Sequence, residues 1–261
     1  MQTVQLGDTR IHYALTGPED GTPVVFANSL GTDFRLWDEI LPMLPGNLRI
    51  LRFDKRGHGL SDTPKGPYSM GALITDTERL MDHLGLKDTI FVGLSIGGMI
   101  AQGLAAKRLD LVRAMVLSNT AAKIGTRDMW AERIANVEKA GLADIVDPTM
   151  DRWFSKPFHQ TDEFPAWRNM FLRTPAEGWT GCAAAISGTD FMSSTSGLRL
   201  PTLAIAGSED GSTPPDLVFE TADLIPGSQK HLIRNAGHLP CVEQPEEYAR
   251  VLTDFLKAQC A

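Results

Sequence analysis

Ser95 lies in the sequence GLSIG, and its surroundings make it the residue best placed to do chemistry. The G-x-S-x-G spacing is that of a nucleophile elbow, a sharp turn that exposes a serine hydroxyl. An apolar, strand-like segment (89–93) precedes the motif and a helical pattern follows it. Glycine is favoured at positions 93 and 97, because a side chain at either position would clash in the strained turn. The alternative interpretation is an ordinary serine in a glycine-rich strand-to-helix turn.

A serine hydroxyl is a weak nucleophile, so it needs a general base that is held in place by an acid. His238 fits the base, because it lies in a loop between the last strand-like segment and the C-terminal helical pattern. Asp210 follows the strand-like segment 202–206 after a short turn and is the preferred acid, with Glu209 as the alternative. The other role open to Asp210 is to cap a helix N-terminus.

Two further polar residues occupy positions where a member of such a triad could stand. His58 follows a strand-like segment but precedes the serine, so its loop is interpreted as hydrogen-bonded structure. Asn119 occupies the alternative acid position after segment 112–118, and an amide cannot act as the acid. The remaining histidines lie in strand-like, helical or inserted segments and are interpreted as structural: His12, His83, His159 and His231.

Acyl transfer from an ester also needs two hydrogen-bond donors for the oxyanion of the tetrahedral intermediate. The backbone N–H of Ile96, directly after the serine, is the first expected donor. The second should come from the loop after the strand-like segment 23–28, and the N–H of Leu30 is favoured. The alternative is that this loop is a plain turn.

The elements that must position these residues alternate between short apolar strands and helices. Strands are predicted at 4–6, 11–15, 23–28, 50–54, 89–94, 112–118, 202–206 and 230–234, and helices include 70–84 and 245–256. This alternation predicts an α/β fold, with a mostly parallel central sheet and helices on both faces. Residues 122–195 show only helical patches and hold four of the five tryptophans. We therefore expect a core of residues 1–121 and 196–261 and a helical cap of residues 122–195.

The composition excludes several classes of partner. The net charge of the 261 residues is −7, without a stripe of Lys and Arg, so neither nucleic acid nor an anionic membrane is an expected partner. No apolar run approaches the ~18 residues of a membrane span. The N-terminus lacks signal-peptide features, and a cytoplasmic location is expected. Cys182, Cys241 and Cys260 lack metal-ligand spacing, so we expect reduced thiols and no metal.

The order Ser95, Asp210, His238 along the chain resembles that of the α/β-hydrolase superfamily and differs from the order in the two common serine protease folds. The resemblance extends over essentially the whole chain. It implies the α/β-hydrolase fold with these three residues as its triad. It also implies that no metal or organic cofactor is required.

A narrower resemblance, to the 3-oxoadipate enol-lactonases, is carried by four short stretches. They are NSLGT at 28–32, WAERI at 130–134, RWF at 152–154 and TPAEGW at 174–179, with Cys182 close behind the last. That family acts in aromatic catabolism through protocatechuate or catechol. The resemblance implies a small anionic enol-lactone substrate, opened through an acyl-enzyme on Ser95 and released as 3-oxoadipate.

An anionic substrate would need a local cation to offset the net negative charge. Arg133 is the candidate because a guanidinium donates two parallel hydrogen bonds to a carboxylate, and Arg152 is the second choice. Trp130 and Trp153 are the expected apolar walls of the pocket. The alternative is that the arginine lies on a solvated helix face and the tryptophans are core.

Other functions are compatible with the same scaffold. A carboxylesterase, a C–C bond hydrolase and a cofactor-free perhydrolase would share the triad, and fold analogy does not separate them. A ligand-binding protein without turnover is the alternative from another class. The sequence does not determine the oligomeric state, because an apolar cap could serve as a lid or as a subunit interface.

Overall fold

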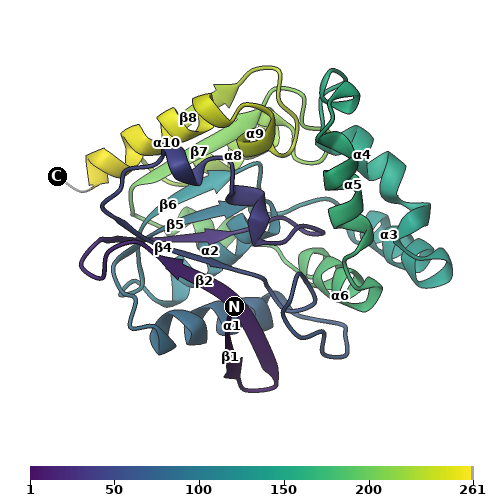
Figure 1. Ribbon diagram of the computed structural model, residues 1–261, viewed down its shortest axis with the longest axis horizontal. Helices are drawn as coiled ribbons and strands as arrows, with labels where there is room; N and C mark the ends of the chain where they lie inside the picture. Colours follow the sequence, from purple (N-terminus) through teal and green to yellow (C-terminus); the bar gives the residue numbers. More distant parts are fainter. Residues whose placement is uncertain (260–261) are drawn as a thin grey trace.

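The computed structural model describes residues 1–259, which fold around an eight-stranded sheet of order β1-β2-β4-β3-β5-β6-β7-β8 (Figure 1). The strands are β1 (Gln2–Leu6), β2 (Thr9–Thr16), β3 (Thr22–Ala27), β4 (Leu48–Phe53), β5 (Thr89–Leu94), β6 (Val112–Ser118), β7 (Thr202–Gly207) and β8 (Gln229–Ile233). The pairs β1–β2 and β2–β4 are antiparallel, and all other neighbouring strands are parallel. The predicted mostly parallel sheet is confirmed, and each strand begins and ends within two residues of its predicted ends.

The central strands are continuous apolar runs because both faces of the sheet are covered. Every residue of β5 and of β7 is buried, whereas β1, at the edge of the sheet, is mostly exposed. The uniform burial explains why these strands are visible in the sequence as unbroken apolar segments rather than as alternating patterns.

The helices of the core divide between the two faces of the sheet. They are α1 (Met70–His83), α2 (Ile96–Lys107), α8 (Pro215–Asp223), α9 (Pro240–Glu243) and α10 (Pro245–Gln259), with the short 3-10 helices η1 (Phe34–Trp37) and η2 (Leu41–Met43). The connection from β3 to β4 runs toward β1, and the later connections run toward β8. Right-handed crossovers therefore place η1 and η2 on one face and α1, α2 and α8 on the other. Helix α10 lies on the same face as η1, and the ring centroids of Tyr248 and Trp37 are 6.3 Å apart.

Residues 122–195, for which we keep the name cap, lie between β6 and β7 at one end of the sheet (Figure 1). They carry α3 (Arg127–Ala140), η3 (Leu142–Asp144), α4 (Val146–Trp153), η4 (Phe158–Gln160), α5 (Phe164–Leu172) and α6 (Ala176–Ser187); α7 (Met192–Ser196) follows. No strand occurs in this segment, as expected. Its buried side chains join those of the sheet in one continuous apolar cluster. The cap therefore packs on the core, and its treatment as a separate domain stays a prediction.

Some expectations from composition fall on residues that the structure describes. Cys182 and Cys241 are buried free thiols, and Cys260 lies outside the described residues. Within residues 1–259 no group of three or more His, Cys, Asp or Glu side chains is arranged to hold a metal ion. In the same range, every helix is too short or too polar to cross a membrane.

Candidate active site

Ser95 lies between β5 and α2 in a strained backbone conformation, with φ 57° and ψ −118°. Residues with a Cβ adopt this region rarely, and such strain is found mainly at functional sites. A Cβ on Gly93 would lie 2.3 Å from the carbonyl oxygen of Gly97, and one on Gly97 would lie 2.0 Å from that of Ala27. Only glycine fits at either position. Thr120 Oγ1 donates to the Ser95 carbonyl at 2.6 Å and holds the turn.

The position of Ser95 in the sheet favours ligand binding. The strand order reverses between β3 and β5, so their carboxyl ends form the topological switch point at which open α/β sheets bind ligands. Ser95 follows β5, and the loop 28–32 follows β3. The predicted nucleophile and the predicted oxyanion loop therefore meet at this edge.

Asp210 and His238 are in direct contact, with 2.8 Å between Asp210 Oδ2 and His238 Nδ1. The same carboxylate oxygen accepts hydrogen bonds from Thr213 Oγ1 at 2.7 Å and from Asn119 Nδ2 at 2.8 Å. The other oxygen accepts from the N–H groups of Ser212 and Thr213, at 2.7 and 3.0 Å. The carboxylate is thus fixed from every side.

Burial by itself would raise the pKa of Asp210, but the charge of His238 and the hydrogen bonds to the carboxylate outweigh it and hold the pKa below its usual value. Asp210 therefore stays ionised next to the imidazole. Glu209 is exposed, and the structure shows no contact between its side chain and His238. Asn119, at the alternative acid position, supports Asp210 rather than replacing it.

The far side of the His238 imidazole faces a cavity that Ser95 and Ser29 also line. Its Nε2 lies 3.4 Å from Ser29 Oγ, and among residues 1–259 no hydrogen bond joins it to Ser95 Oγ. Ser95 and His238 therefore face the same cavity, and their roles as nucleophile and general base stay predictions. The main chain of the cap holds the histidine: His238 N–H donates to the carbonyl of Trp153 at 2.7 Å.

Glu243 links the histidine loop to the cap. Its Oε1 accepts from the N–H of Gly237 at 2.6 Å, and its Oε2 accepts from the N–H and hydroxyl of Ser155 at 2.9 and 2.5 Å. Burial raises the pKa of Glu243, and these hydrogen bonds counteract the shift. Glu243 therefore links Gly237, which directly precedes His238, to Ser155, which follows α4.

The cavity has a volume of about 140 Å³, below the ~300–1,000 Å³ of pockets for drug-sized ligands. A small substrate is therefore expected. The cavity brings together the four pocket residues named from the sequence, the predicted nucleophile and base, and further apolar side chains of the cap. Its lining includes Ser29, Leu30, Ser95, Met129, Trp130, Arg133, Thr149, Arg152, Trp153, Phe171, Trp179, Ile186, Thr213 and His238.

The two arginines of the cavity carry positive charge, and no carboxylate of residues 1–259 forms an ion pair with either of them. Arg133 lies over the Trp130 ring, 5.1 Å from its centroid, and makes no ion pair within residues 1–259. Arg152 donates to Thr149 Oγ1 at 3.1 Å, and its buried Nε has no partner among the described residues. Burial and the charge of Arg133 lower the pKa of Arg152 to about 10. The cavity wall is therefore suited to an anion.

His58 has a structural role, as predicted. Its Nε2 accepts a hydrogen bond from the N–H of Gly31 at 2.9 Å, which fastens the loop after β3. Burial holds the pKa of His58 well below its usual value, so the imidazole is neutral and can accept.

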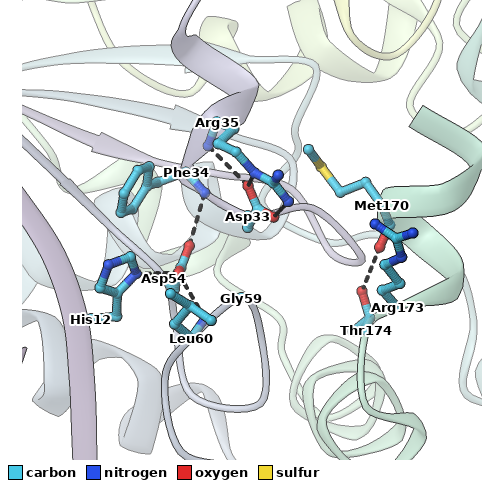
Figure 2. Close-up of a pocket in the computed structure, with 10 residues that line it drawn as sticks. All are labelled: His12, Asp33, Phe34, Arg35, Asp54, Gly59, Leu60, Met170, Arg173 and Thr174. Atoms are coloured by element: carbon cyan, nitrogen blue, oxygen red, sulfur yellow. Dashed lines mark hydrogen bonds and ion pairs between the residues drawn. The ribbon is translucent and has the colours of Figure 1, made fainter. Parts of the chain in front are cut away.

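A larger cavity, of about 360 Å³, is lined by the next residues of the same loop, and Figure 2 shows its side chains. His12 Nδ1 lies 2.8 Å from Asp54 Oδ2, and Asp54 Oδ1 accepts from the N–H of Phe34 at 2.8 Å. Arg35 is paired with Asp33. The predicted nucleophile and base line the smaller cavity and not this one, so we place the candidate active site at the smaller cavity.

Residues 24–251 match the alpha/beta hydrolase family. The chain belongs to that family. A 3-oxoadipate enol-lactonase from Acinetobacter baylyi is 33% identical over 266 residues, which cover 99% of this chain and 97% of that protein. The crystal structure of the enol-lactonase from Burkholderia xenovorans LB400 has a TM-score of 0.94 and 32% identity, covering 98% of this chain and 100% of that one. A malate-bound thermophilic esterase from Thermogutta terrifontis has a TM-score of 0.92 and 28% identity, covering 99% of both chains. The resemblance inferred from the sequence is confirmed, and the chain is a hydrolase.

Several polar residues of this α/β-hydrolase site were not identified from the sequence. Ser29, Thr213 and Glu243 contact the predicted triad or its loops. The sequence shows only that Asn119 cannot be the acid, and it does not show that Asn119 donates a hydrogen bond to Asp210. Only the positions of these residues in the sequence could have indicated a role, because each lies at a strand end or within a few residues of a predicted site residue. Residue type did not distinguish them from ordinary loop residues.

Proposed function

We propose that this carboxylic ester hydrolase opens the ring of 3-oxoadipate enol-lactone and releases 3-oxoadipate, in the catabolism of aromatic compounds. One observation carries the proposal: a small cavity is lined by Ser95, by His238 and by two guanidiniums that have no carboxylate partner within residues 1–259. The enol-lactonases among the relatives support the same substrate.

In the proposed mechanism, Ser95 Oγ attacks the lactone carbonyl carbon and passes its proton to His238 Nε2. The N–H groups of Leu30 and Ile96 donate to the oxyanion. When the tetrahedral intermediate collapses, the ring C–O bond breaks and leaves an acyl-enzyme. The leaving enolate takes the proton and becomes a ketone. A water molecule, deprotonated by His238, then attacks the acyl carbon, and Ser95 recovers its proton as the product leaves.

The remaining site residues orient these groups and bind the substrate. The Asp210 carboxylate holds the His238 imidazole in the tautomer that accepts a proton at Nε2, and it stabilises the imidazolium that forms. Arg133 and Arg152 bind the substrate carboxylate. Trp179 also lines the cavity, and its buried Nε1 has no acceptor within residues 1–259, so it is a further donor for substrate oxygens.

A second candidate is a carboxylesterase for other small anionic esters. It is favoured by the Thermogutta terrifontis esterase, which resembles this chain along its whole length and was crystallised with malate. Both candidates use the same triad and the same cationic wall, and they differ only in the ester that reacts.

The test compares kcat/KM for 3-oxoadipate enol-lactone with kcat/KM for a neutral aryl acetate. We expect the lactone to be preferred by at least ~100-fold, because only its carboxylate uses the arginines. Ser95→Ala and His238→Ala should each lower kcat by at least ~1,000-fold. Their melting temperatures should match those of the exposed-site controls Ser193→Ala and His83→Ala. Activity retained in folded Ser95→Ala would refute the mechanism, and a preference for the ester would refute the substrate.

A further inference from the structure

Lys55, the second residue after β4, is a buried cation whose contacts point to a role in the reaction. Only 3% of the surface of Lys55 is exposed to solvent. Its Nζ donates to the carbonyl oxygen of Ser29 at 2.7 Å and lies 3.5 Å from that of Thr32. No carboxylate within residues 1–259 lies at ion-pair distance from it. A buried ammonium without a counter-ion is costly, so its position calls for a reason beyond packing.

The carbonyl that Lys55 binds belongs to the same peptide unit as the predicted oxyanion donor. In a trans peptide, the C=O of Ser29 and the N–H of Leu30 point in opposite directions. Lys55 occupies the oxygen end of this unit. At the other end, Leu30 lines the cavity with Ser95, and within residues 1–259 its N–H donates to no backbone acceptor in the turns and loops.

The neighbouring peptides of the loop are fixed as well. Gly31 N–H donates to His58 Nε2 at 2.9 Å, and Asn28 Nδ2 donates to the carbonyl of Thr32. Asp54, directly before Lys55, accepts from the N–H of Phe34 at the far end of the loop (Figure 2). Because Leu30 lines the cavity and its N–H has no hydrogen-bond acceptor among residues 1–259, this N–H is available to a ligand in the cavity.

We propose that Lys55 is a positioning residue for the oxyanion hole: its ammonium orients and polarises the Ser29–Leu30 peptide, so that the Leu30 N–H is a preformed and strengthened donor. The proposal rests on the serine hydrolase function proposed above. A charge-assisted hydrogen bond is roughly twice as strong as a neutral one. Hydrogen bonds in series polarise one another in a low-dielectric site, and preorganised donors stabilise the transition state more than the ground state.

The groups that face Lys55 determine how it responds to pH. Burial lowers the pKa of Lys55 to about 8, although nearby charges counteract the shift. Cys182, from α6, is neutral at this pH because burial raises its pKa to about 12, and His58 is neutral because burial lowers its pKa. Asp54 and Asp33 are the carboxylates whose charge acts on Lys55. As the pH rises through about 8, Lys55 loses its proton and the polarising charge disappears.

The direct test replaces Lys55 by methionine, which keeps the apolar stem and removes the ammonium. We expect Lys55→Met to lower kcat by ~10–100-fold for the lactone and the neutral ester alike, less than the ~100–1,000-fold loss of a whole oxyanion donor. KM should stay within about twofold and the melting temperature should change little, because relief of the uncompensated buried charge offsets the lost hydrogen bond to the Ser29 carbonyl. The kcat of the wild type should decline as the pH rises through about 8, and that decline should be absent from Lys55→Met. Lys87→Met, at an exposed lysine before β5, is the matched control.

A kcat within twofold of wild type, or a loss confined to KM, would overturn the proposal. If Lys55→Met does not fold, nuclear magnetic resonance of the wild type decides. The Leu30 amide proton shift should titrate with the same midpoint as the Lys55 Nζ signal, and an amide shift that ignores that titration would overturn the proposal. Ser95→Ala separates this outcome from failure of the proposed function. If Ser95→Ala keeps its activity, the hydrolase mechanism fails, whereas an inert Ser95→Ala beside an unaffected Lys55→Met refutes only the role of Lys55.

Discussion

Arg133 is close enough to Arg152 that its charge lowers the pKa of Arg152. Both line a small cavity, and neither forms an ion pair within the described residues 1–259. Like charges in a partly dry site repel each other, and an anion that enters between them removes this repulsion. In the proposed function, this electrostatic repulsion gives the cavity its selectivity for a carboxylate.

The prediction at this scale concerns Arg133→Met and Arg152→Met. We expect each to raise KM for the anionic lactone by ~10–100-fold, the loss of a charge-assisted interaction, and to leave kcat/KM for the neutral ester within about twofold. Arg168→Met is the control, because Arg168 lies in the cap but is already paired with Asp147. Equal losses on both substrates in steady-state assays would show that these arginines only support the cap.

At the scale of helices and strands, the predictable features were those that follow from local sequence. The strands were visible as apolar runs, and the elbow at Ser95 was visible because its turn demands glycine. Lys55, Glu243 and Asn119 were not, because their roles depend on groups far away in the sequence that only the fold brings near. Hydrophobic periodicity predicts which face of a helix or strand is buried, but it does not predict which polar groups form hydrogen bonds with one another in the folded chain.

The contact between α6 and the loop after β4 gives a prediction at this scale. A Cβ on Gly178 would lie 2.1 Å from the carbonyl oxygen of Gly57, so Gly178→Ala must push the helix away. We expect the free energy of unfolding in urea to fall by ~1–3 kcal/mol. Gly71, in α1, has only a contact at 3.7 Å, so Gly71→Ala should raise this free energy by ~0.5–1 kcal/mol through helix propensity. Equal effects of the two substitutions would mean that the α6 contact is not tight.

For the whole molecule, the charge balance and the proposed substrate oppose each other. The chain carries a net charge of −7, and the proposed substrate is an anion. Surface charges are screened beyond ~8–10 Å at physiological ionic strength, whereas the two half-buried guanidiniums act at contact distance. Binding is therefore decided inside the cavity rather than by the global field.

Because the cavity lies between cap and core, a bound ligand should stabilise both together. Adipate, a stable dicarboxylate, at about 100 times its dissociation constant should add ~2.7 kcal/mol to the free energy of unfolding. For a chain of this size the melting temperature should rise by ~5–10 °C. Dimethyl adipate should have no such effect, and the double variant Arg133→Met/Arg152→Met should lose it. A rise that survives in the double variant, measured by scanning calorimetry, would place the anion elsewhere.

The cap supports the predicted triad with main-chain atoms: the carbonyl of Trp153 receives the N–H of His238, and the carbonyl of Arg152 receives the N–H of Gly211. A carbonyl persists through every side-chain substitution at its residue. Substitutions of α4 side chains that line the cavity therefore leave these main-chain anchors of the predicted base and acid in place. A one-residue insertion or deletion in α4 would instead displace both anchors at once. The substrate range can thus change through substitutions in α4, whereas a change in the length of α4 would also displace the predicted acid and base.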